Sequence, residues 1–576
     1  MTKKADNLKR DTQSKDSSSK RKAQPQHSAS KYSDQVVHKP VQRRNPKANE
    51  LTTHVAAILQ NETFILVGIL VVALIFRLYR LHEPFGGFHG FNEAFYANLA
   101  RDYLNKPIFE LFTKPVDLNN PPLFTFMLVL MYKLIGVSEA VSRIIPIAAS
   151  MGAIFYSYLL ASRLFSRTTG LVTAALLSVS PAFSILSRNV QADMVFVCFI
   201  LAAFYHYERG RDSQGLGHTV AAGILFGLAL LAKLPAVLGI VALVIYEIFR
   251  SKGAVLKSRS FIGVMGLTAL VAALWYGYQL LFNAGAFLSS QESIAGVLQL
   301  PDSRFWYELF LKELVWAFNP LMFVLAIIGI VYLGVKRSVS GSMLILSIIL
   351  GFTSFYILYH FHTYYLLPLM PFGIIAAAYF LESLFQDRKQ LVIATVGLYM
   401  VSVFFTGILM HSVKFGYTEF ADIKNLTGQP ISESTTVYAQ QIVFDNFGTL
   451  LSFYFPNNRI IPLPNEALTK KSDSIAVTFG RFKGQEDARL NQIGVYPIAK
   501  HDYYVVLLGK GFREEPGNMH RFAFGNITAI DTGSSLDFGI KDVPRIFGFN
   551  LLDMRQQQAW MDEAAKAGLA GLGVVK

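Results

Sequence analysis

The 576 residues include 52% hydrophobic and only 16% charged side chains, and the mean hydropathy is +0.37. Soluble domains carry about 25% charged residues, so this composition excludes an ordinary soluble protein and predicts a membrane protein. The formal net charge is +14, yet residues 1–50 alone hold 13 Lys and Arg against 5 Asp and Glu. The positive charge is therefore concentrated in a tail, and we expect no nucleic-acid partner.

Residues 1–62 are rich in Ser, Lys, Gln and Pro and poor in apolar residues. Such a segment cannot bury enough surface to fold, so we predict a disordered basic tail on the cytoplasmic side. The first apolar run begins only near Phe64, and no small-residue cleavage pattern follows it, which favours an uncleaved anchor. The single cysteine, Cys198, lies in an apolar run, so neither a disulfide framework nor a thiolate metal site is expected.

Apolar runs near the 20 residues that span a bilayer follow between residues 63 and 411. Lys and Arg gather in short loops near residues 163–167, 209–211, 250–259, 336–337 and 388–389. The positive-inside rule assigns these loops to the cytoplasm. With these markers the chain predicts eleven spans, near residues 64–81, 143–164, 170–187, 190–207, 218–232, 234–250, 261–282, 314–335, 342–360, 364–384 and 391–411.

The predicted sides of the later loops depend on two segments. If residues 121–136 crossed the membrane, every later basic loop would move outside, so we predict an interfacial or re-entrant helix there. Residues 218–250 must turn at Lys233 and Pro235, because one long helix would break the alternation. The threading puts residues 82–142, 188–193 and 283–313 on the outer face.

Residues 412–576 follow the last span and are therefore predicted outside as well. They alternate β-like runs at 436–438, 474–479 and 503–508 with helical or Gly-rich and Asn-rich stretches, which predicts a mixed α/β domain. The predicted fold class is an α-helical polytopic membrane protein with about eleven spans, outer interfacial helices and this extracytoplasmic α/β domain. The predicted domains are 1–62, 63–411 and 412–576.

Polar residues that could carry chemistry lie in the outer segments. Asn92, Glu93 and Tyr96 stand in the first outer loop at a membrane boundary, where dehydration suits a carboxylate to act as a general base or cation ligand. Glu93 could equally begin a helix and interact with its dipole. Arg188 and Asp193 lie where two spans meet; ionisable groups at membrane depth suggest function, although a mutual ion pair is the simpler alternative.

These residues also carry a resemblance. In order and spacing the chain resembles the glycosyltransferase 39 and 83 families, the dolichyl-phosphate-mannose protein mannosyltransferases and aminoarabinose transferases of the GT-C superfamily. The similarity covers roughly residues 64–385, and it rests on Asn92-Glu93-Ala94-Phe95-Tyr96-Ala97, Pro121-Pro122-Leu123, the span 143–165, the turn 188–193, Leu231-Ala232-Lys233-Leu234-Pro235 and Tyr364-Tyr365-Leu366-Leu367-Pro368-Leu369-Met370-Pro371.

The resemblance implies an inverting enzyme that moves a hexosyl or pentosyl group from a polyprenyl-phosphate sugar donor to an extracytoplasmic acceptor, which is a protein, lipid or glycan. The acidic pair of the family falls on Asn92 and Glu93, so the first acid is absent here and the catalytic role shifts to Glu93. The second acidic position falls on Asp193, which with Glu93 could hold a divalent metal cation.

Roles in binding the substrate or the lipid phosphate are implied for five further residues: Tyr96, Arg188, Lys233, His362 and Tyr364. Arg188 would hold Asp193 or a phosphate. Lys233 is a candidate for the lipid phosphate, with snorkelling as its alternative. His362 and Tyr364, beside His360, could complete a metal or phosphate site or anchor the span at the interface.

Two other function classes stay open from the sequence. A transporter also has many spans and proline-broken segments, but no inverted repeat is visible and the polar groups cluster at the outer boundary. An inactive GT-C homologue that binds membrane lipid as a scaffold would fit the missing acid at Asn92. We expect a multi-pass protein of the cell membrane, or of the ER membrane in a eukaryote, with its N-terminus in the cytoplasm.

Overall fold

The structure is a computed structural model that describes residues 62–85, 90–115, 120–213, 215–295, 306, 309–310, 314–336, 340–358, 363–386, 388–412, 433–439, 441–462, 474–479, 495–498 and 503–508. The predicted tail, apart from its last residue, lies outside the described residues, as do His360 and His362. The tail, the domain boundaries and the role of His362 therefore stay predictions.

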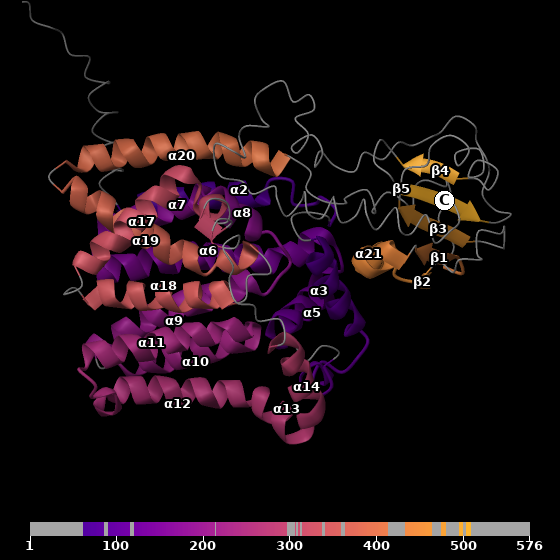
Figure 1. Cartoon of the computed structure of the whole chain (residues 1–576), viewed down its shortest axis with the longest axis horizontal. Coiled ribbons are helices and arrows are strands. Elements are labelled where there is room, and N and C mark those ends of the chain that lie inside the picture. Colours follow the sequence, from indigo (N-terminus) through magenta and orange to yellow (C-terminus); the bar gives the residue numbers. More distant parts are fainter. Residues whose placement is uncertain are drawn as a thin grey trace, which may run out of the picture. The chain divides into compact units, whose positions relative to one another are not determined.

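The described residues between 62 and 412 are mainly helical and contain no strand (Figure 1). The longer helices are α2 (Glu62–Leu78), α3 (Gly90–Asp102), α5 (Leu123–Ile135), α6 (Glu139–Leu164), α7 (Arg167–Val179), α9 (Asp193–Ser213), α10 (Leu216–Ala232), α11 (Val237–Arg250), α12 (Arg259–Ala273), α14 (Ala284–Ala295), α17 (Pro320–Val335), α18 (Ser340–Leu358), α19 (Leu369–Leu384) and α20 (Lys389–Ser412). Short helices fill the connections: α4 (Glu110–Thr113), α8 (Pro181–Leu186), α13 (Tyr276–Phe282), α16 (Leu314–Phe318) and the 3₁₀ turns η1 (Leu234–Ala236), η2 (Val255–Lys257) and η4 (Thr363–Leu366).

Three predicted spans are broken helices rather than single ones. The segment predicted at 170–187 divides into α7 and α8 because Pro181 has no N–H to continue the first helix and begins the second. Pro320 begins α17 in the same way, after the side chain of Asn319 caps it by accepting from the Met322 N–H at 3.0 Å. The segment 261–282 bends by 47° between α12 and α13.

By length and composition, one described helix, Glu139–Leu164, could cross a membrane unbroken, and the bent pair α12 and α13 could form a second crossing. Seven further apolar helices in the described part have 10 to 17 residues. The count of eleven spans therefore stays a prediction. The required turn at Lys233 is present, because α10 ends at Ala232 and α11 begins at Val237.

Contacts bring the predicted cytoplasmic turns to one end of the helices. Glu382, near the end of α19, accepts hydrogen bonds from Ser166 and Thr169 at the start of α7. The start of α18 meets the end of α6, where a Cβ on Gly341 would lie 2.9 Å from the Cβ of Leu164. The ends of α9 and α11 join through a hydrogen bond from the Tyr207 hydroxyl to Glu247. The alternation of helix directions thus matches the basic loops, while which side faces the cytoplasm stays a prediction.

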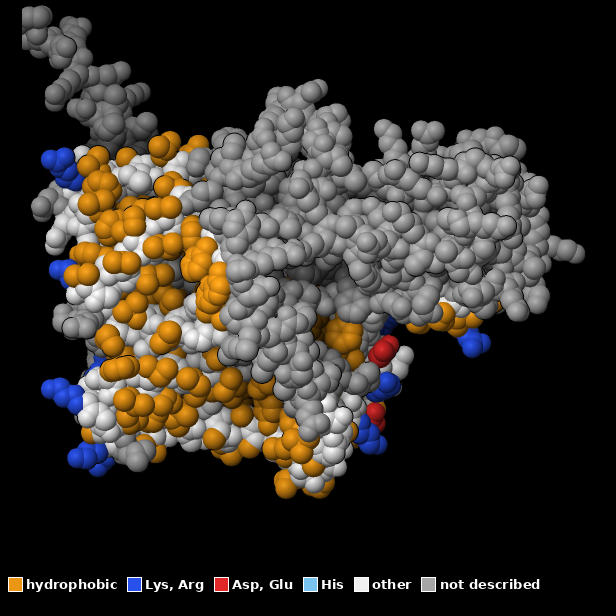
Figure 2. All heavy atoms as spheres, in the orientation of Figure 1, with side chains coloured by type: hydrophobic (Ala, Val, Ile, Leu, Met, Phe, Trp, Pro, Cys, Tyr) orange, Lys and Arg blue, Asp and Glu red, His pale blue; other side chains and the backbone are white. Residues whose placement is uncertain are grey.

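The helices expose apolar side chains along their length. Figure 2 shows hydrophobic side chains spread over the face that carries α11, α12 and α18, with Lys and Arg along one edge. Large exposed side chains in α17 include Leu321 (56%), Val331 (63%) and Val335 (73%). Contiguous apolar surface of this kind is unfavourable in water and suits contact with lipid.

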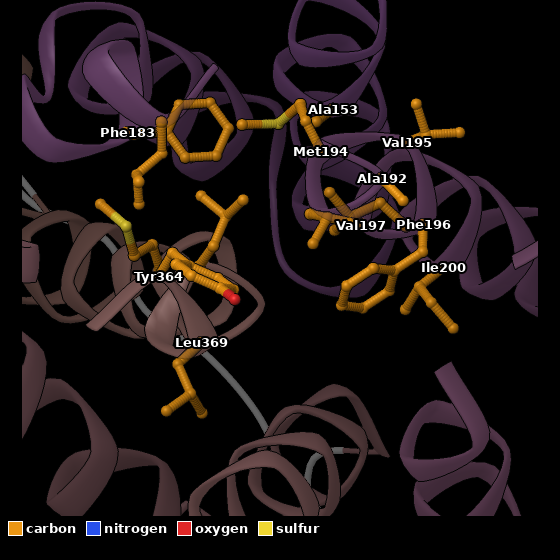
Figure 3. Close-up of a cluster of buried hydrophobic side chains, with 14 of the residues drawn as sticks. Ala153, Phe183, Ala192, Met194, Val195, Phe196, Val197, Ile200, Tyr364 and Leu369 are labelled. Atoms are coloured by element: carbon orange, nitrogen blue, oxygen red, sulfur yellow. The ribbon is translucent and has the colours of Figure 1, made fainter. Parts of the chain in front are cut away.

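The interior is packed around α9. Figure 3 shows Phe183 of α8, Met194, Phe196 and Ile200 of α9 and Tyr364 of η4 in one cluster of buried side chains. Each of these residues is no more than 6% exposed. The core therefore reaches the ends of the helices, where the polar residues singled out in the sequence lie.

The described C-terminal part contains helix α21 (Gln441–Tyr454) and a five-stranded sheet in the order β2-β1-β3-β5-β4. The strands are β1 (Thr436–Ala439), β2 (Ile460–Pro462), β3 (Ser474–Phe479), β4 (Val495–Ile498) and β5 (Tyr503–Leu508). β1 is parallel to β2 and β3, and β5 is antiparallel to β3 and β4. The three runs predicted as strands from the sequence are strands in the structure.

Candidate functional site

The segment predicted as the first outer loop contains helix α3, whose first turn carries Asn92 and Glu93. Ala94, Ala97 and Ala100 are fully buried, so small side chains at helical spacing let α3 pack closely. Glu93 lies at the helix N-terminus, where the dipole favours a carboxylate. At 1% exposure, this carboxylate also needs a partner within the protein.

Arg143, in the first turns of α6, is the partner of Glu93. Its Nε lies 3.2 Å from Glu93 Oε1, and its Nη2 lies 3.5 Å from Oε2. The same guanidinium donates to the backbone carbonyls of Leu81, Glu83 and Pro84. Glu93 therefore belongs to a buried ion pair that also fixes the chain after α2, a contact that the helix-dipole interpretation does not include.

Arg188 lies beside this pair and is not the ionic partner of Asp193, while its role toward a phosphate stays a prediction. Its Nη2 donates to the Arg80 carbonyl at 2.8 Å, and the charges of Arg143 and Glu93 act on it. Burial lowers the pKa of Arg188 to about 10, so the side chain stays a cation at neutral pH. The predicted pairing of Arg188 with Asp193 is wrong.

Asp193 pairs instead with Lys233, 40 residues further along the chain. Both carboxylate oxygens lie 2.7 Å from Nζ, and the side chains are 5% and 14% exposed. Asp193 begins α9, and Lys233 follows the last residue of α10 in an extended conformation. Because Pro235 prevents α10 from continuing, the turn presents the ammonium group at the helix end.

Tyr364 connects this second ion pair to α3. The Lys233 ammonium lies 4.9 Å from the centre of the Tyr364 ring and 5.1 Å from that of Tyr365, within the range of a cation–π interaction. The Tyr364 side chain also lies close enough to Asn92, Tyr365 and the charge of Asp193 to interact with them. The structure thus brings Asn92, Asp193, Lys233 and Tyr364 together.

Tyr96, one turn after Asn92, extends the polar cluster toward the start of α5. Its hydroxyl donates to Asn120 Oδ1 at 2.8 Å, and its ring meets that of Phe124 edge to face at 5.1 Å. Pro121 and Pro122 follow Asn120 and lead directly into α5. The Pro-Pro-Leu motif therefore sets the position of a hydrogen-bond partner of α3.

A divalent metal does not fit the donors that the structure describes. The described residues contain no group of three His, Cys, Asp or Glu side chains placed to hold an ion. Glu93 and Asp193 are each engaged by a cationic side chain. The metal stays a prediction.

Two partners of the candidate residues were missed from the sequence. Arg143 and Tyr365 were noted only as parts of motifs, although each contacts a candidate residue. Arg143 lies four residues after the start of an apolar helix. This position is itself a sequence signal, because a buried cation requires a carboxylate partner. The sequence offered Arg188 and Asp193 as neighbours, whereas the structure pairs residues 40 and 50 positions apart.

The chain is similar to known proteins in sequence and in fold. Residues 119–277, which include α5, Arg143, Asp193 and Lys233, match the family model of dolichyl-phosphate-mannose-protein mannosyltransferase. The crystal structure of ArnT from Cupriavidus metallidurans bound to undecaprenyl phosphate has a TM-score of 0.55 at 16% identity, covering 77% of this chain and 97% of that chain. The chain has a GT-C fold. The resemblance predicted from the sequence is confirmed.

Two further matches extend this comparison. The apo structure of the same ArnT gives a TM-score of 0.55 at 15% identity and covers 80% of this chain and 98% of that one. An uncharacterized protein of Aquifex aeolicus is 28% identical over 224 residues, which are 38% of this chain. The chain matches 44% of the length of that relative. The GT-C fold thus extends over most of the chain, whereas the sequence likeness is confined to part of it.

Proposed function

We propose that this GT-C protein is an inverting glycosyltransferase that moves a sugar from a polyprenyl-phosphate donor to an acceptor on the outer face of the membrane. The observation that carries the proposal is the cluster of buried Asp193 and Tyr364 with half-buried Asn92 and Lys233, at the helix ends opposite the basic turns. The family match over residues 119–277 and the likeness to an ArnT structure with undecaprenyl phosphate support the same class.

The proposed reaction is a single displacement at the anomeric carbon. An acceptor hydroxyl oxygen attacks the anomeric carbon. At the same time the bond between this carbon and the phosphate oxygen breaks, and the lipid phosphate leaves with the bonding electrons. The hydroxyl proton passes to a carboxylate. A site for this chemistry needs a proton acceptor on one side of the sugar and positive charge at the leaving phosphate on the other.

Asp193 is the better-supported proton acceptor. Its only described ionic partner is a lysine ammonium, a compact charge on a flexible stem that can turn to another anion. Glu93, by contrast, contacts an arginine that is also held by three backbone carbonyls. We assign Glu93 to positioning α3 and keep it as the second candidate for the base, because the amide of Asn92 cannot accept the proton.

Lys233 is the proposed partner of the donor phosphate. When the phosphate arrives, the ammonium would exchange part of its contact with Asp193 for the phosphate oxygens, which frees a carboxylate oxygen for the acceptor. Arg188 adds a second cation, which is buried, at the same end of the helices as Lys233. Asn92 and Tyr364 supply hydrogen-bonding groups for sugar hydroxyls next to this charge.

The experiment uses the full-length protein in lipid nanodiscs with a labelled polyprenyl-phosphate mannose and a pentose analogue. Asp193→Asn should lower sugar transfer by about 10²- to 10⁴-fold, the usual contribution of a positioned general base. Glu93→Gln should lower it less, and Asp102→Asn, which neutralises an exposed carboxylate on the same helix, should leave it unchanged. Parallel assays with EDTA test the predicted divalent cation.

Three outcomes would count against the proposal. Full activity of both Asp193→Asn and Glu93→Gln would remove the site assignment. A wild-type protein that binds the donor lipid without releasing or transferring its sugar would indicate the inactive homologue that Asn92 suggested. Passage of the intact donor across a sealed membrane, without sugar transfer, would favour a transporter.

A further inference from the structure

Helix α21 of the C-terminal part contacts the element that carries the candidate site. The sequence singled out no catalytic motif in this part, and its residues are about 350 positions from α3. Nevertheless, side chains of α3 and the backbone before it form hydrogen bonds with the last turns of α21. These contacts are specific enough to assign a role to α21.

The first contact is between the ends of two helices. Arg101, in the last turn of α3, donates from Nη2 to the Ser452 carbonyl at 2.7 Å and from Nη1 to the Phe453 carbonyl at 3.1 Å. Carbonyls in the last turn of a helix lack partners within it, and a cation there also interacts with the dipole. Asn98 adds a bond to the Thr449 carbonyl at 2.7 Å, so two residues one turn apart on α3 bind α21.

The second contact reaches the ion pair of Glu93 by a different route. The Tyr454 hydroxyl accepts a hydrogen bond from the Phe85 N–H at 2.7 Å. The Phe85 ring is fully buried, lies 4.6 Å from that of Phe453 and faces the Arg143 guanidinium at 5.3 Å. Phe85 directly follows Glu83 and Pro84, whose backbone carbonyls accept hydrogen bonds from Arg143. By binding the Phe85 N–H, Tyr454 therefore holds the loop that positions Arg143.

We propose that Tyr454 and Arg101 are positioning residues through which the C-terminal α/β part holds the glycosyltransferase site in its working geometry. Tyr454 acts on the loop 81–85 and the Arg143–Glu93 pair, and Arg101 acts on α3 and hence on Asn92 and Tyr96. Neither touches the proposed reacting groups. Burial raises the pKa of Tyr454, so its hydroxyl remains a neutral hydrogen-bonding group at physiological pH.

This inference rests on the proposed function for its kinetic readout, so the first test does not use activity. Hydrogen exchange of the full-length protein in nanodiscs is compared between wild type and Tyr454→Phe, which keeps the ring and removes the hydroxyl. Exchange in residues 81–102 should become faster by about fivefold, the equivalent of one neutral hydrogen bond. Exchange in α9 should not change, and Tyr438→Phe in strand β1 is the matched control.

The second test is kinetic. Tyr454→Phe should lower kcat by about three- to tenfold with the KM for the polyprenyl-phosphate sugar nearly unchanged, because the loss of one hydrogen bond affects geometry rather than donor contacts. Arg101→Gln should behave similarly, and Arg101→Lys should recover part of the loss by keeping the cation at the helix end. Tyr438→Phe should match wild type.

The outcomes separate this inference from the function itself. An active wild type with unchanged exchange and unchanged kcat in Tyr454→Phe would overturn the positioning role and leave the function standing. Faster exchange in residues 81–102, in a protein that transfers no sugar, would support the mechanical link and overturn the function. A uniform rise in exchange over all helices would mean that Tyr454 serves overall stability only, and would also overturn the inference.

Discussion

Removing the lysine of the Asp193–Lys233 pair should destabilise the protein more than removing both charges. Lys233→Met keeps the length and apolar stem of the side chain but leaves Asp193, which is 5% exposed, without its cation. Loss of one partner of a buried ion pair costs about 3–5 kcal/mol. Because the Lys233 side chain is 14% exposed and water can reach the vacated position, we expect a loss near the lower limit, about 3 kcal/mol.

The double variant Asp193→Asn, Lys233→Met removes both charges and should recover most of that loss. It should lie within about 1–2 kcal/mol of wild type, because an amide without an ideal partner costs less than an unpaired carboxylate. The coupling is the sum of the two single losses minus the loss in the double variant, so it should be at least about 1–2 kcal/mol, which exceeds the usual deviation from additivity.

Unfolding titrations in mixed detergent micelles measure both variants. The half-buried thiol of Cys198 in α9 offers a reporter, because a thiol-reactive dye labels it faster as the helices separate. A single variant as stable as wild type would show that Lys233 does not compensate Asp193. A double variant less stable than Lys233→Met would show that the unpaired Asp193 carboxylate does not cause the loss of stability in Lys233→Met.

Two further predictions test the packing and the orientation. A Cβ on Gly329 would lie 2.4 Å from the Ala376 carbonyl oxygen, whereas one on Gly334 would meet nothing within 4 Å. Gly329→Ala should therefore destabilise the protein by about 1–3 kcal/mol. Gly334→Ala should leave the stability unchanged in the same unfolding titration. Equal stability of the two would contradict the close approach of α17 and α19. For orientation, a cysteine at exposed Lys106 should react with a membrane-impermeant maleimide in intact cells, and one at Arg167, 75% exposed, only after permeabilisation; reversed labelling would invert the threading.

The sequence predicted the order of the apolar helices well, because hydrophobic run length and basic loops report directly on local structure. The turn at Lys233 and Pro235 and the helix near residues 121–136 were both found in this way. Helix breaks were predicted less well. Pro181 and Pro320 are recognisable as helix starts. The bend between α12 and α13, by contrast, falls at Leu274 and Trp275 without a proline, and Gly277 lies only in the helix that follows.

The sequence marked several polar residues that the structure brings together, but it did not predict their pairings. Motifs mark Asn92, Asp193, Lys233 and Tyr364 as polar groups at helix ends, and the structure brings them together. Which cation meets which carboxylate depends on how α3, α6, α9 and α10 pack, and sequence proximity favoured Arg188 over Lys233. The contacts of α21 with α3 could not be predicted for the same reason, because they involve backbone carbonyls, which leave no signal in the sequence.

The shortness of the helices has a consequence for the surrounding lipid. α10 has 17 residues and α19 has 16, so they extend about 24–26 Å at 1.5 Å per residue, less than the hydrocarbon core of about 30 Å. A bilayer relieves such hydrophobic mismatch by thinning locally, at fractions of a kcal/mol per Å. Thinning would draw the headgroup plane inward toward the end of α10, where Lys233 lies. A polyprenyl phosphate could then meet this ammonium while its chain remained in the bilayer.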